Sequence, residues 1–171
     1  MIRHIPWLTE KAIEFLDGLL KDRPDATVLE FGCGGSTIWM AQRIKNLTSI
    51  EHDGEWFNIV SNYLSGHNEC QRVDIQRMEL PYHSILNDLP DEHFDLVVVD
   101  GRGRVECVKA AMRTVKIGGF ILLDNTERGY YSGAFKLLCL WDMERSEQVG
   151  PDSVGFNHAG WETCWWKKPN K

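Results

Sequence analysis

The feature that most constrains the fold of this chain is an apolar segment near its middle, Phe94–Asp100. Its central part, Leu96–Val99, consists of four consecutive apolar side chains with no polar alternation. Such a run is typical of a strand that is covered on both faces, as in a parallel sheet between two layers of helices. The glycines in Gly101–Arg104 should end the strand, and the spacing of apolar residues predicts a helix over Val105–Val115.

The same alternation of short apolar runs and helical segments extends over most of the chain. Further strands are predicted at Thr27–Phe31, Leu47–Glu51, Cys70–Ile75, Gly118–Asp124 and Trp161–Lys167, and further helices at Trp7–Leu20, Ser36–Ile44, Gly54–Leu64 and Tyr130–Trp141. This order predicts an α/β fold with a mostly parallel sheet and helices on both faces. Because open sheets of this type bind ligands beyond the carboxyl ends of their strands, we expect the chemistry in the loops that follow the strands.

Composition narrows the class of protein. The 171 residues are enough for one domain, and 25 acidic against 19 basic residues give a net charge of -6, which argues against extended contact with nucleic acid. No apolar run approaches the roughly 20 residues that span a bilayer, and the first residues do not resemble a signal peptide. The cysteines are scattered without a Cys-x-x-Cys pair, which is typical of reduced thiols. We therefore expect a cytoplasmic protein with neither a nucleic-acid nor a membrane partner, and the oligomeric state stays open.

A glycine-rich turn follows the first predicted strand. Gly32 and Gly34 let the backbone turn sharply and let a ligand approach main-chain atoms closely. A dinucleotide-binding fingerprint would require a third glycine where this chain has Thr37. Glu30 precedes the turn, where a carboxylate would repel a phosphate and would suit a cationic ligand. The alternative interpretation is a plain strand-to-helix turn, in which Ser36 or Thr37 caps the helix.

An acidic residue, Glu51, closes the second predicted strand about twenty residues after the glycine turn. A carboxylate at this place can accept hydrogen bonds from both hydroxyls of a ribose. An exposed acid at a strand end is the simpler alternative, but the pairing with the glycine turn favours ribose binding.

Four segments, Glu30–Gly34, Ile50–Asp53, Leu96–Asp100 and Lys116–Asp124, resemble in order the motifs of class I S-adenosylmethionine-dependent methyltransferases. The resemblance covers about residues 27 to 125. It implies a Rossmann-like three-layer α/β/α sandwich whose seven-stranded, mostly parallel sheet has the order 3-2-1-4-5-7-6, with strand 7 antiparallel. It also implies a single methyltransferase domain over residues 1–171, with residues 1–25 as an N-terminal helical extension and residues 26–171 as the cofactor-binding core.

The resemblance further implies which residues bind the cofactor, S-adenosyl-L-methionine. It places Glu30, Gly32, Cys33, Gly34 and Ser36 around the methionine part, Glu51 at the ribose hydroxyls, His52 beside the adenine, Asp74 at the adenine amino group, and Asp100 near the sulfonium and the acceptor. A rim rich in carboxylates also makes independent sense for a ligand that carries sulfonium and ammonium charges.

A narrower resemblance concerns a metal site. Enzymes similar to catechol O-methyltransferase hold Mg²⁺ with an aspartate after strand 4 and an Asp-Asn pair after strand 5, where this chain has Asp100, Asp124 and Asn125. Oxygen ligands suit such an ion, which would orient acceptor hydroxyls and lower their pKa. The family also places a lysine shortly after the first aspartate, whereas this chain reads Gly101–Arg104 there. Helix capping and cofactor contacts are therefore the favoured roles, and Mg²⁺ stays possible but not favoured.

These features predict a methyltransferase that acts on a small-molecule acceptor, by O-methylation of a hydroxyl compound such as a sugar or a phenol. Asp100 would be the catalytic residue that orients or deprotonates the acceptor, and His52, His83 and His158 are the other candidate bases. Two alternatives are a non-catalytic module that binds S-adenosylmethionine and, less favoured, an NAD-dependent oxidoreductase.

The loops that follow the strands also carry three arginines, Arg102, Arg104 and Arg128. A guanidinium binds a carboxylate or a phosphate in a two-point fashion, so an anionic acceptor is conceivable. Pairing of these arginines with nearby acids explains them equally well. Trp7 and the pair Tyr130–Tyr131 are candidates for the wall of the acceptor pocket, although aromatic residues at this spacing are more often core.

Overall fold

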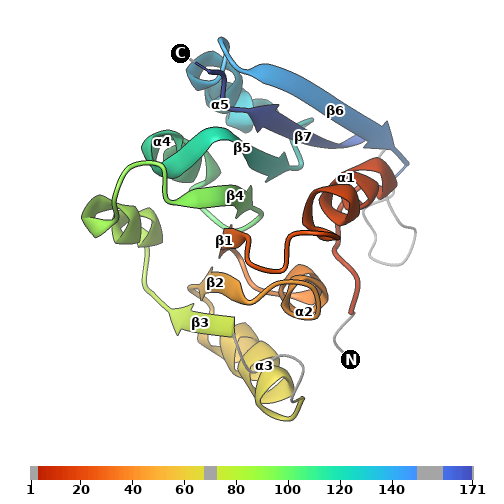
Figure 1. The fold of residues 1–171 in the computed structure, drawn as a ribbon, viewed down its shortest axis with the longest axis vertical. Helices are drawn as coiled ribbons and strands as arrows, with labels where there is room; N and C mark the ends of the chain where they lie inside the picture. The colour runs from red at the N-terminus through yellow and green to blue at the C-terminus, as the bar shows by residue number, and fades with distance from the viewer. Residues whose placement is uncertain (1–3, 68–72, 150–159, 171) are drawn as a thin grey trace.

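A seven-stranded sheet organises the computed structural model, which describes residues 4–67, 73–149 and 160–170 (Figure 1). The strands are β1 (Thr27–Phe31), β2 (Asn46–Glu51), β3 (Val73–Arg77), β4 (Phe94–Val99), β5 (Val115–Asp124), β6 (Asp142–Gln148) and β7 (Trp161–Lys167). Their order is β3-β2-β1-β4-β5-β7-β6, and β7 runs antiparallel to both of its neighbours. The fold class, the strand order and the direction of the last strand are confirmed.

Helices cover both faces of the sheet, as the uninterrupted apolar strands predict (Figure 1). They are α1 (Glu10–Leu20), α2 (Gly35–Ala41), α3 (Gly54–Ser65), α4 (Arg104–Thr114) and α5 (Ser132–Leu137), with short 3₁₀ helices η2 (Tyr82–Asp88) and η3 (Gly129–Tyr131). Leu96 and Val98 of β4 pack with α1, α2 and α3. Val97 and Val99 point to the opposite face and pack with α4, α5 and η2. Alternate side chains of β4 thus build two separate cores. None of the helices in the described ranges is both long and apolar enough to cross a membrane.

Apart from shifts of one to three residues at the ends of several helices and strands, three elements differ from the sequence prediction. The third strand is β3 rather than Cys70–Ile75, so it ends two residues later than expected; Cys70 itself lies outside the described residues. The helix predicted over Tyr130–Trp141 is replaced by η3 and a short α5, and Leu140 beyond it is 86% exposed. The strand β6 was not predicted, because its sequence is almost entirely polar. An edge strand that pairs on one side only needs no apolar run.

The chain passes very close to itself where β1 and β4 end. Gly32 has a φ of 96°, and a Cβ added to it would lie 2.8 Å from the Cα of Gly101. A Cβ on Gly101 would overlap with the hydroxyl oxygen of Tyr82, which accepts a hydrogen bond from the Arg102 amide. Two glycines without side chains therefore allow the loops after β1 and β4 to touch.

A buried carboxyl group joins α2 to the sheet. Glu30 of β1 is fully buried, and its carboxylate accepts hydrogen bonds from the hydroxyls of Ser36, of Thr37 at 2.5 Å and of Ser49 at 2.6 Å. Thr37 Oγ1 in turn accepts a hydrogen bond from the Gly34 amide at 2.8 Å. Burial raises the pKa of Glu30 to about 7, and the three hydroxyl donors oppose that rise. Glu30 thus holds the glycine turn in place from behind.

Substitution of Gly32 by alanine should destabilise the protein by about 1–3 kcal/mol, because the new methyl group meets main-chain atoms and the residue keeps a positive φ. The matched control is Gly18→Ala in α1, where the added Cβ has no neighbour within 4 Å. That variant should be stabilised by about 0.4–1 kcal/mol. Urea unfolding of both variants checks the prediction, and equal effects would contradict the close approach of the two loops.

The Glu30 carboxyl group should make the free energy of unfolding depend on pH. Its pKa in the folded protein, about 7, exceeds its ordinary value of 4.5, so the folded protein binds this proton more tightly than the unfolded chain does. The contribution of Glu30 to the free energy of unfolding is therefore fully present below pH 4.5. About 3 kcal/mol of it is lost as the pH rises to about 7.

The variant Glu30→Gln removes this titration. The stability of the variant relative to wild type should therefore increase between pH 5 and pH 7.5 and then level off, as thermal or urea unfolding across that range would measure. Parallel curves for the two proteins would contradict the assignment.

Candidate active site

A cavity of about 680 Å³ opens at the carboxyl ends of β1, β2, β4 and β5. This is the place where a parallel sheet with the observed order binds its ligands, because the connections from β1 and β4 diverge there. The loops after the strands supply most of its walls, and the list of lining residues is Trp7, Gly32, Cys33, Glu51, His52, Asp53, Glu55, Trp56, Ile59, Asp100, Gly101, Arg102, Arg104, Asp124, Asn125, Arg128, Tyr131 and Trp161.

Glu51 links the loop after β2 to the loop after β1. Its Oε1 accepts hydrogen bonds from the amides of His52 and Asp53, both at 2.8 Å, and its Oε2 accepts one from the Cys33 amide at 3.1 Å. The Nδ1 atom of His52 lies 2.8 Å from the same Oε1. The carboxylate is nearly buried and is held in one orientation by main-chain donors. It therefore faces the cavity as a pre-positioned acceptor.

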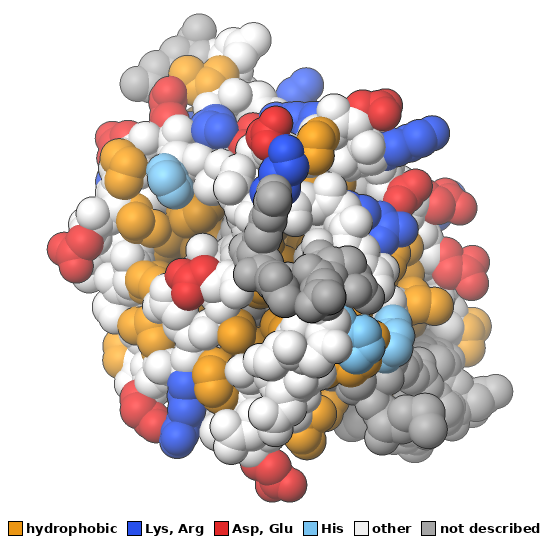
Figure 2. Space-filling model, turned by 60° about the horizontal axis from the view of Figure 1, so that its bottom comes forward, with side chains coloured by type: hydrophobic (Ala, Val, Ile, Leu, Met, Phe, Trp, Pro, Cys, Tyr) orange, Lys and Arg blue, Asp and Glu red, His pale blue; other side chains and the backbone are white. Residues whose placement is uncertain are grey.

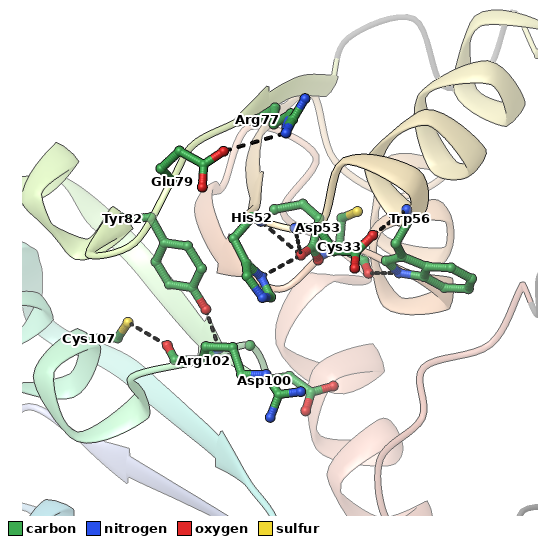
Figure 3. Close-up of polar contacts among 12 residues, drawn as sticks. Cys33, His52, Asp53, Trp56, Arg77, Glu79, Tyr82, Asp100, Arg102 and Cys107 are labelled. Atoms are coloured by element: carbon green, nitrogen blue, oxygen red, sulfur yellow. Dashed lines mark hydrogen bonds and ion pairs between the residues drawn. The ribbon is translucent and has the colours of Figure 1, made fainter.

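An indole ring covers the glycine turn. Asp53 caps α3 by accepting the Trp56 amide at 2.8 Å, and this cap directs Trp56 toward the turn. The indole Nε1 donates to the Cys33 carbonyl at 2.6 Å, and a Cβ on Gly34 would lie only 3.9 Å from the ring (Figure 3). Since Trp56 is still 39% exposed, its free face is open to a ligand.

One guanidinium fixes the opposite side of the cavity. Arg104, which is 7% exposed, donates to the carbonyls of Gly101 and Asp100 at 2.9 Å and of Asp124 at 2.6 Å. Its Nη2 also lies 2.9 Å from Asp100 Oδ1, and its guanidinium carbon lies 5.1 Å from the centre of the Tyr131 ring. A single buried cation thus ties the loop after β4 to the loop after β5 and holds the Asp100 side chain.

Asp100 and Asp124 differ in their readiness to ionise. Burial, together with the negative charge of Asp100, raises the pKa of Asp124 to about 8, against the Thr163 hydroxyl that donates to Oδ1 at 2.6 Å. Burial also raises the pKa of Asp100, to about 6, but Arg104 and Arg128 oppose that rise. The two carboxyl groups interact, so ionisation of one raises the pKa of the other, and the two arginines favour the negative charge on Asp100.

The optional magnesium site does not fit these contacts. Asp100 is paired with Arg104, and Asp124 receives hydrogen bonds from the Thr163 hydroxyl and, at 3.2 Å, from the Trp161 indole. These donors occupy Oδ1 of both aspartates, which reduces the oxygen atoms left for a cation between them. Within the described ranges, no three His, Cys, Asp or Glu side chains are grouped to hold a metal ion. Asn125 lines the cavity with a left-handed φ of 56° and adds one amide to this wall.

Most of the residues predicted for the site line the cavity: Gly32, Cys33, Glu51, His52 and Asp100, together with Asp124, Asn125 and the three arginines. Gly34 lies at the turn beneath Trp56. Tyr131 and Trp7 also line the cavity, whereas Tyr130 is 68% exposed and does not.

Three further residues that were predicted to bind the cofactor do not line the cavity. Glu30 is fully buried and accepts a hydrogen bond from the hydroxyl of Ser36. Both side chains therefore support the turn on the side away from the cavity, and neither lines the cavity. Asp74 pairs with Thr48 inside β3 and accepts a hydrogen bond from Gln76 at 2.6 Å on the surface. Because β3 ends at Arg77, Asp74 lies too early in the strand to reach the cavity.

Of the other candidate bases, His83 belongs to η2 and does not line the cavity, and His158 lies outside the described residues. Sequence reasoning missed Trp56 and Trp161. A signal existed for Trp56, since an aspartate three residues before it is typical of a helix cap and sets the direction of the first helical turn.

Comparison with known proteins supports the geometry. The model of a family described as a methyltransferase domain matches residues 29–126, which is more than half of the chain. Comparison with curated proteins finds no match.

Solved structures share the fold at low sequence identity. An O-methyltransferase from Bacillus cereus in complex with SAH has a TM-score of 0.73 at 17% identity, over 94% of this chain and 82% of that chain. The O-methyltransferase TomG from Streptomyces achromogenes, in complex with SAM, has a TM-score of 0.73 at 17% identity, over 95% and 82%. Precorrin 8w decarboxylase from Methanobacterium thermoautotrophicum has a TM-score of 0.71 at 19% identity, over 97% and 94%.

The strand order, the position of the cavity and the match of the family model lead to the same result. The chain belongs to the methyltransferase-domain family and has the class I, Rossmann-like fold of the S-adenosylmethionine-dependent methyltransferases.

Proposed function

We propose that this protein is an S-adenosylmethionine-dependent methyltransferase that methylates a hydroxyl group of a small molecule. The observation that carries the proposal is that one cavity holds both a fixed ribose acceptor, Glu51 at the end of β2, and a carboxyl group, Asp100 after β4, on either side of β1. When bound, S-adenosylmethionine supplies a methyl group activated on a positively charged sulfur. The residues of this chain would bind that cofactor, exclude water and orient the acceptor.

The β1 and β2 side of the cavity suits the cofactor. On Glu51, Oε1 already has the amides of His52 and Asp53 and the His52 ring as neighbours, whereas Oε2 accepts only the Cys33 amide. A carboxylate oxygen has about two acceptor positions, so Oε2 has room for a ribose hydroxyl. Asp53 and Glu55 add negative charge at the same rim, which favours a ligand with ammonium and sulfonium groups. The open face of Trp56 and the glycine turn allow close approach by a flat or flexible part of the ligand.

Asp100 is the residue that would handle the acceptor proton. It stands at the carboxyl end of β4 in the middle of the cavity, and Arg104 holds its Oδ1 while the second oxygen has no such partner among the described residues. With a pKa of about 6, it is ionised at neutral pH and able to accept a proton from a hydroxyl group. A fixed carboxylate next to the reacting methyl also positions the nucleophile for transfer.

Cofactor binding should depend on Glu51 and not on Asp74. Calorimetric titration with S-adenosylhomocysteine should show that Glu51→Ala weakens binding by about 1–3 kcal/mol, the typical value of hydrogen bonds to a charged group. Asp74→Ala, which removes an equal charge outside the cavity, should bind as the wild type does. Absence of binding by the wild type would reject the methyltransferase proposal, and an equal loss in both variants would reject the cofactor position.

The rate of methyl transfer should depend on Asp100. Asp100→Asn should reduce kcat by about 10²–10⁴-fold, the usual contribution of a general base, while S-adenosylhomocysteine binding persists. In the wild type, kcat should rise with pH up to about 6 and then level off, because only the ionised carboxylate accepts a proton. A variant that keeps the wild-type rate and pH profile would show that Asp100 is not the base. A wild type that binds the cofactor but methylates no hydroxyl compound would favour a non-catalytic binding module.

A further inference from the structure

The two halves of the cavity differ in charge. On the side of β1 and β2 the charged lining residues are all acidic: Glu51, Asp53 and Glu55. The β4 and β5 side has all three arginines, Arg102, Arg104 and Arg128, next to the carboxyl groups of Asp100 and Asp124. On the face that Figure 2 draws, lysine and arginine side chains are interspersed with aspartate and glutamate. The three arginines in one half of a cavity therefore need a specific explanation.

The guanidinium of Arg104 has a structural role, whereas those of Arg102 and Arg128 have few or no partners in the protein. All three nitrogens of Arg104 donate hydrogen bonds to main-chain carbonyls. The guanidinium of Arg102, by contrast, forms no hydrogen bond or ion pair with any residue in the described part of the chain. Only its main-chain groups have partners: the amide donates to the Tyr82 hydroxyl, and the carbonyl accepts from the Cys107 thiol at 3.6 Å. Figure 3 shows Arg102 beside Asp100 in the loop after β4, with no interaction drawn between the two side chains.

Arg128 is only loosely held. Its Nη1 lies 3.3 Å from the hydroxyl oxygen of Tyr130, and its Nε lies 3.5 Å from Glu127 Oε1, which is a long distance for an ion pair. Glu127 also accepts the Glu162 amide at 3.0 Å through its other oxygen, so its charge is shared. Pairing with acids in the protein thus accounts for Arg104 and leaves Arg102 and much of Arg128 open to the cavity.

We propose that the acceptor is an anion, a carboxylate or a phosphate monoester, and that Arg102 and Arg128 bind its charged group. This inference rests on the proposed methyltransferase function and names the substrate class for the same site. Arg102 is two residues from Asp100 on one loop, so a small molecule held by the arginine would place a nearby hydroxyl group within reach of the carboxylate. A guanidinium provides the two parallel donors that match either oxyanion.

The two carboxyl groups in the β4 and β5 half of the cavity, Asp100 and Asp124, are compatible with a bound anion there. The charge of Asp100 is compensated by Arg104 at 2.9 Å. Asp124 is buried beside Thr163 and Trp161, and this burial raises its pKa to about 8. An acceptor anion would therefore meet two arginines and one compensated carboxylate, while the acidic half stays available for the positively charged cofactor.

Paired probes that differ only in charge test this proposal. The protein saturated with S-adenosylhomocysteine is titrated calorimetrically with 4-hydroxybenzoate against 4-hydroxybenzamide, and with glucose 6-phosphate against glucose. At least one anion should bind about tenfold or more tightly than its neutral partner. Arg102→Gln and Arg128→Gln should each weaken that anion about 10–100-fold, the loss expected for a charge-assisted contact. Neither variant should change the affinity for S-adenosylhomocysteine or for the neutral probe.

Lys109→Gln is the matched control, because it removes the same charge from an exposed position of α4 outside the cavity. It should leave anion binding unchanged. Equal binding of anionic and neutral probes, no binding of either anion, or an anion affinity that both arginine variants retain would overturn the inference. Repeating the titrations without S-adenosylhomocysteine separates the two proposals. Anion binding that depends on the arginines in a protein that fails to bind S-adenosylhomocysteine would reject the cofactor and keep the anion site.

Discussion

The site depends on the contact between the main chains of Gly32 and Gly101. These residues end neighbouring parallel strands, and the amide of Asp100 donates to the Phe31 carbonyl at 2.9 Å just before the strands separate. Because no side chain stands between them, the loops after β1 and β4 form one continuous surface. The cofactor side and the acceptor side of the cavity are therefore parts of a single space.

Two buried charged groups then give this surface its shape. Glu51 fixes the loops after β1 and β2 by accepting main-chain amides, and Arg104 fixes the loops after β4 and β5 by donating to main-chain carbonyls. Each group is hydrogen-bonded to main-chain groups of complementary polarity, amides for the carboxyl group and carbonyls for the guanidinium. The carboxylate on one side and the guanidinium on the other also set the direction of the electric field across the cavity.

Sequence patterns predicted the strands that are buried on both faces. They failed to predict, or misplaced, elements that are only partly buried. The strands at Thr27–Phe31 and Trp161–Lys167 match the prediction at both ends. The edge strand β6 has no apolar run to indicate it, and a mixed composition placed the third strand too early, which brought Asp74 into the predicted site. The sequence also did not predict the direction of the Glu30 side chain. A carboxylate before a glycine turn suits a cation in principle, but Glu30 points away from the cavity because three hydroxyls from α2 and β2 donate hydrogen bonds to it inside the fold.

The central claim is that one cavity holds S-adenosylmethionine on its acidic side with the reacting methyl directed toward Asp100. A crystal structure of the protein with S-adenosylhomocysteine tests this most directly. The account predicts the ribose hydroxyls at Glu51 and the sulfur atom on the Asp100 side of the glycine turn, with Glu30 still enclosed by its hydroxyl partners. A ribose bound away from Glu51, or a ligand outside the cavity, would contradict it.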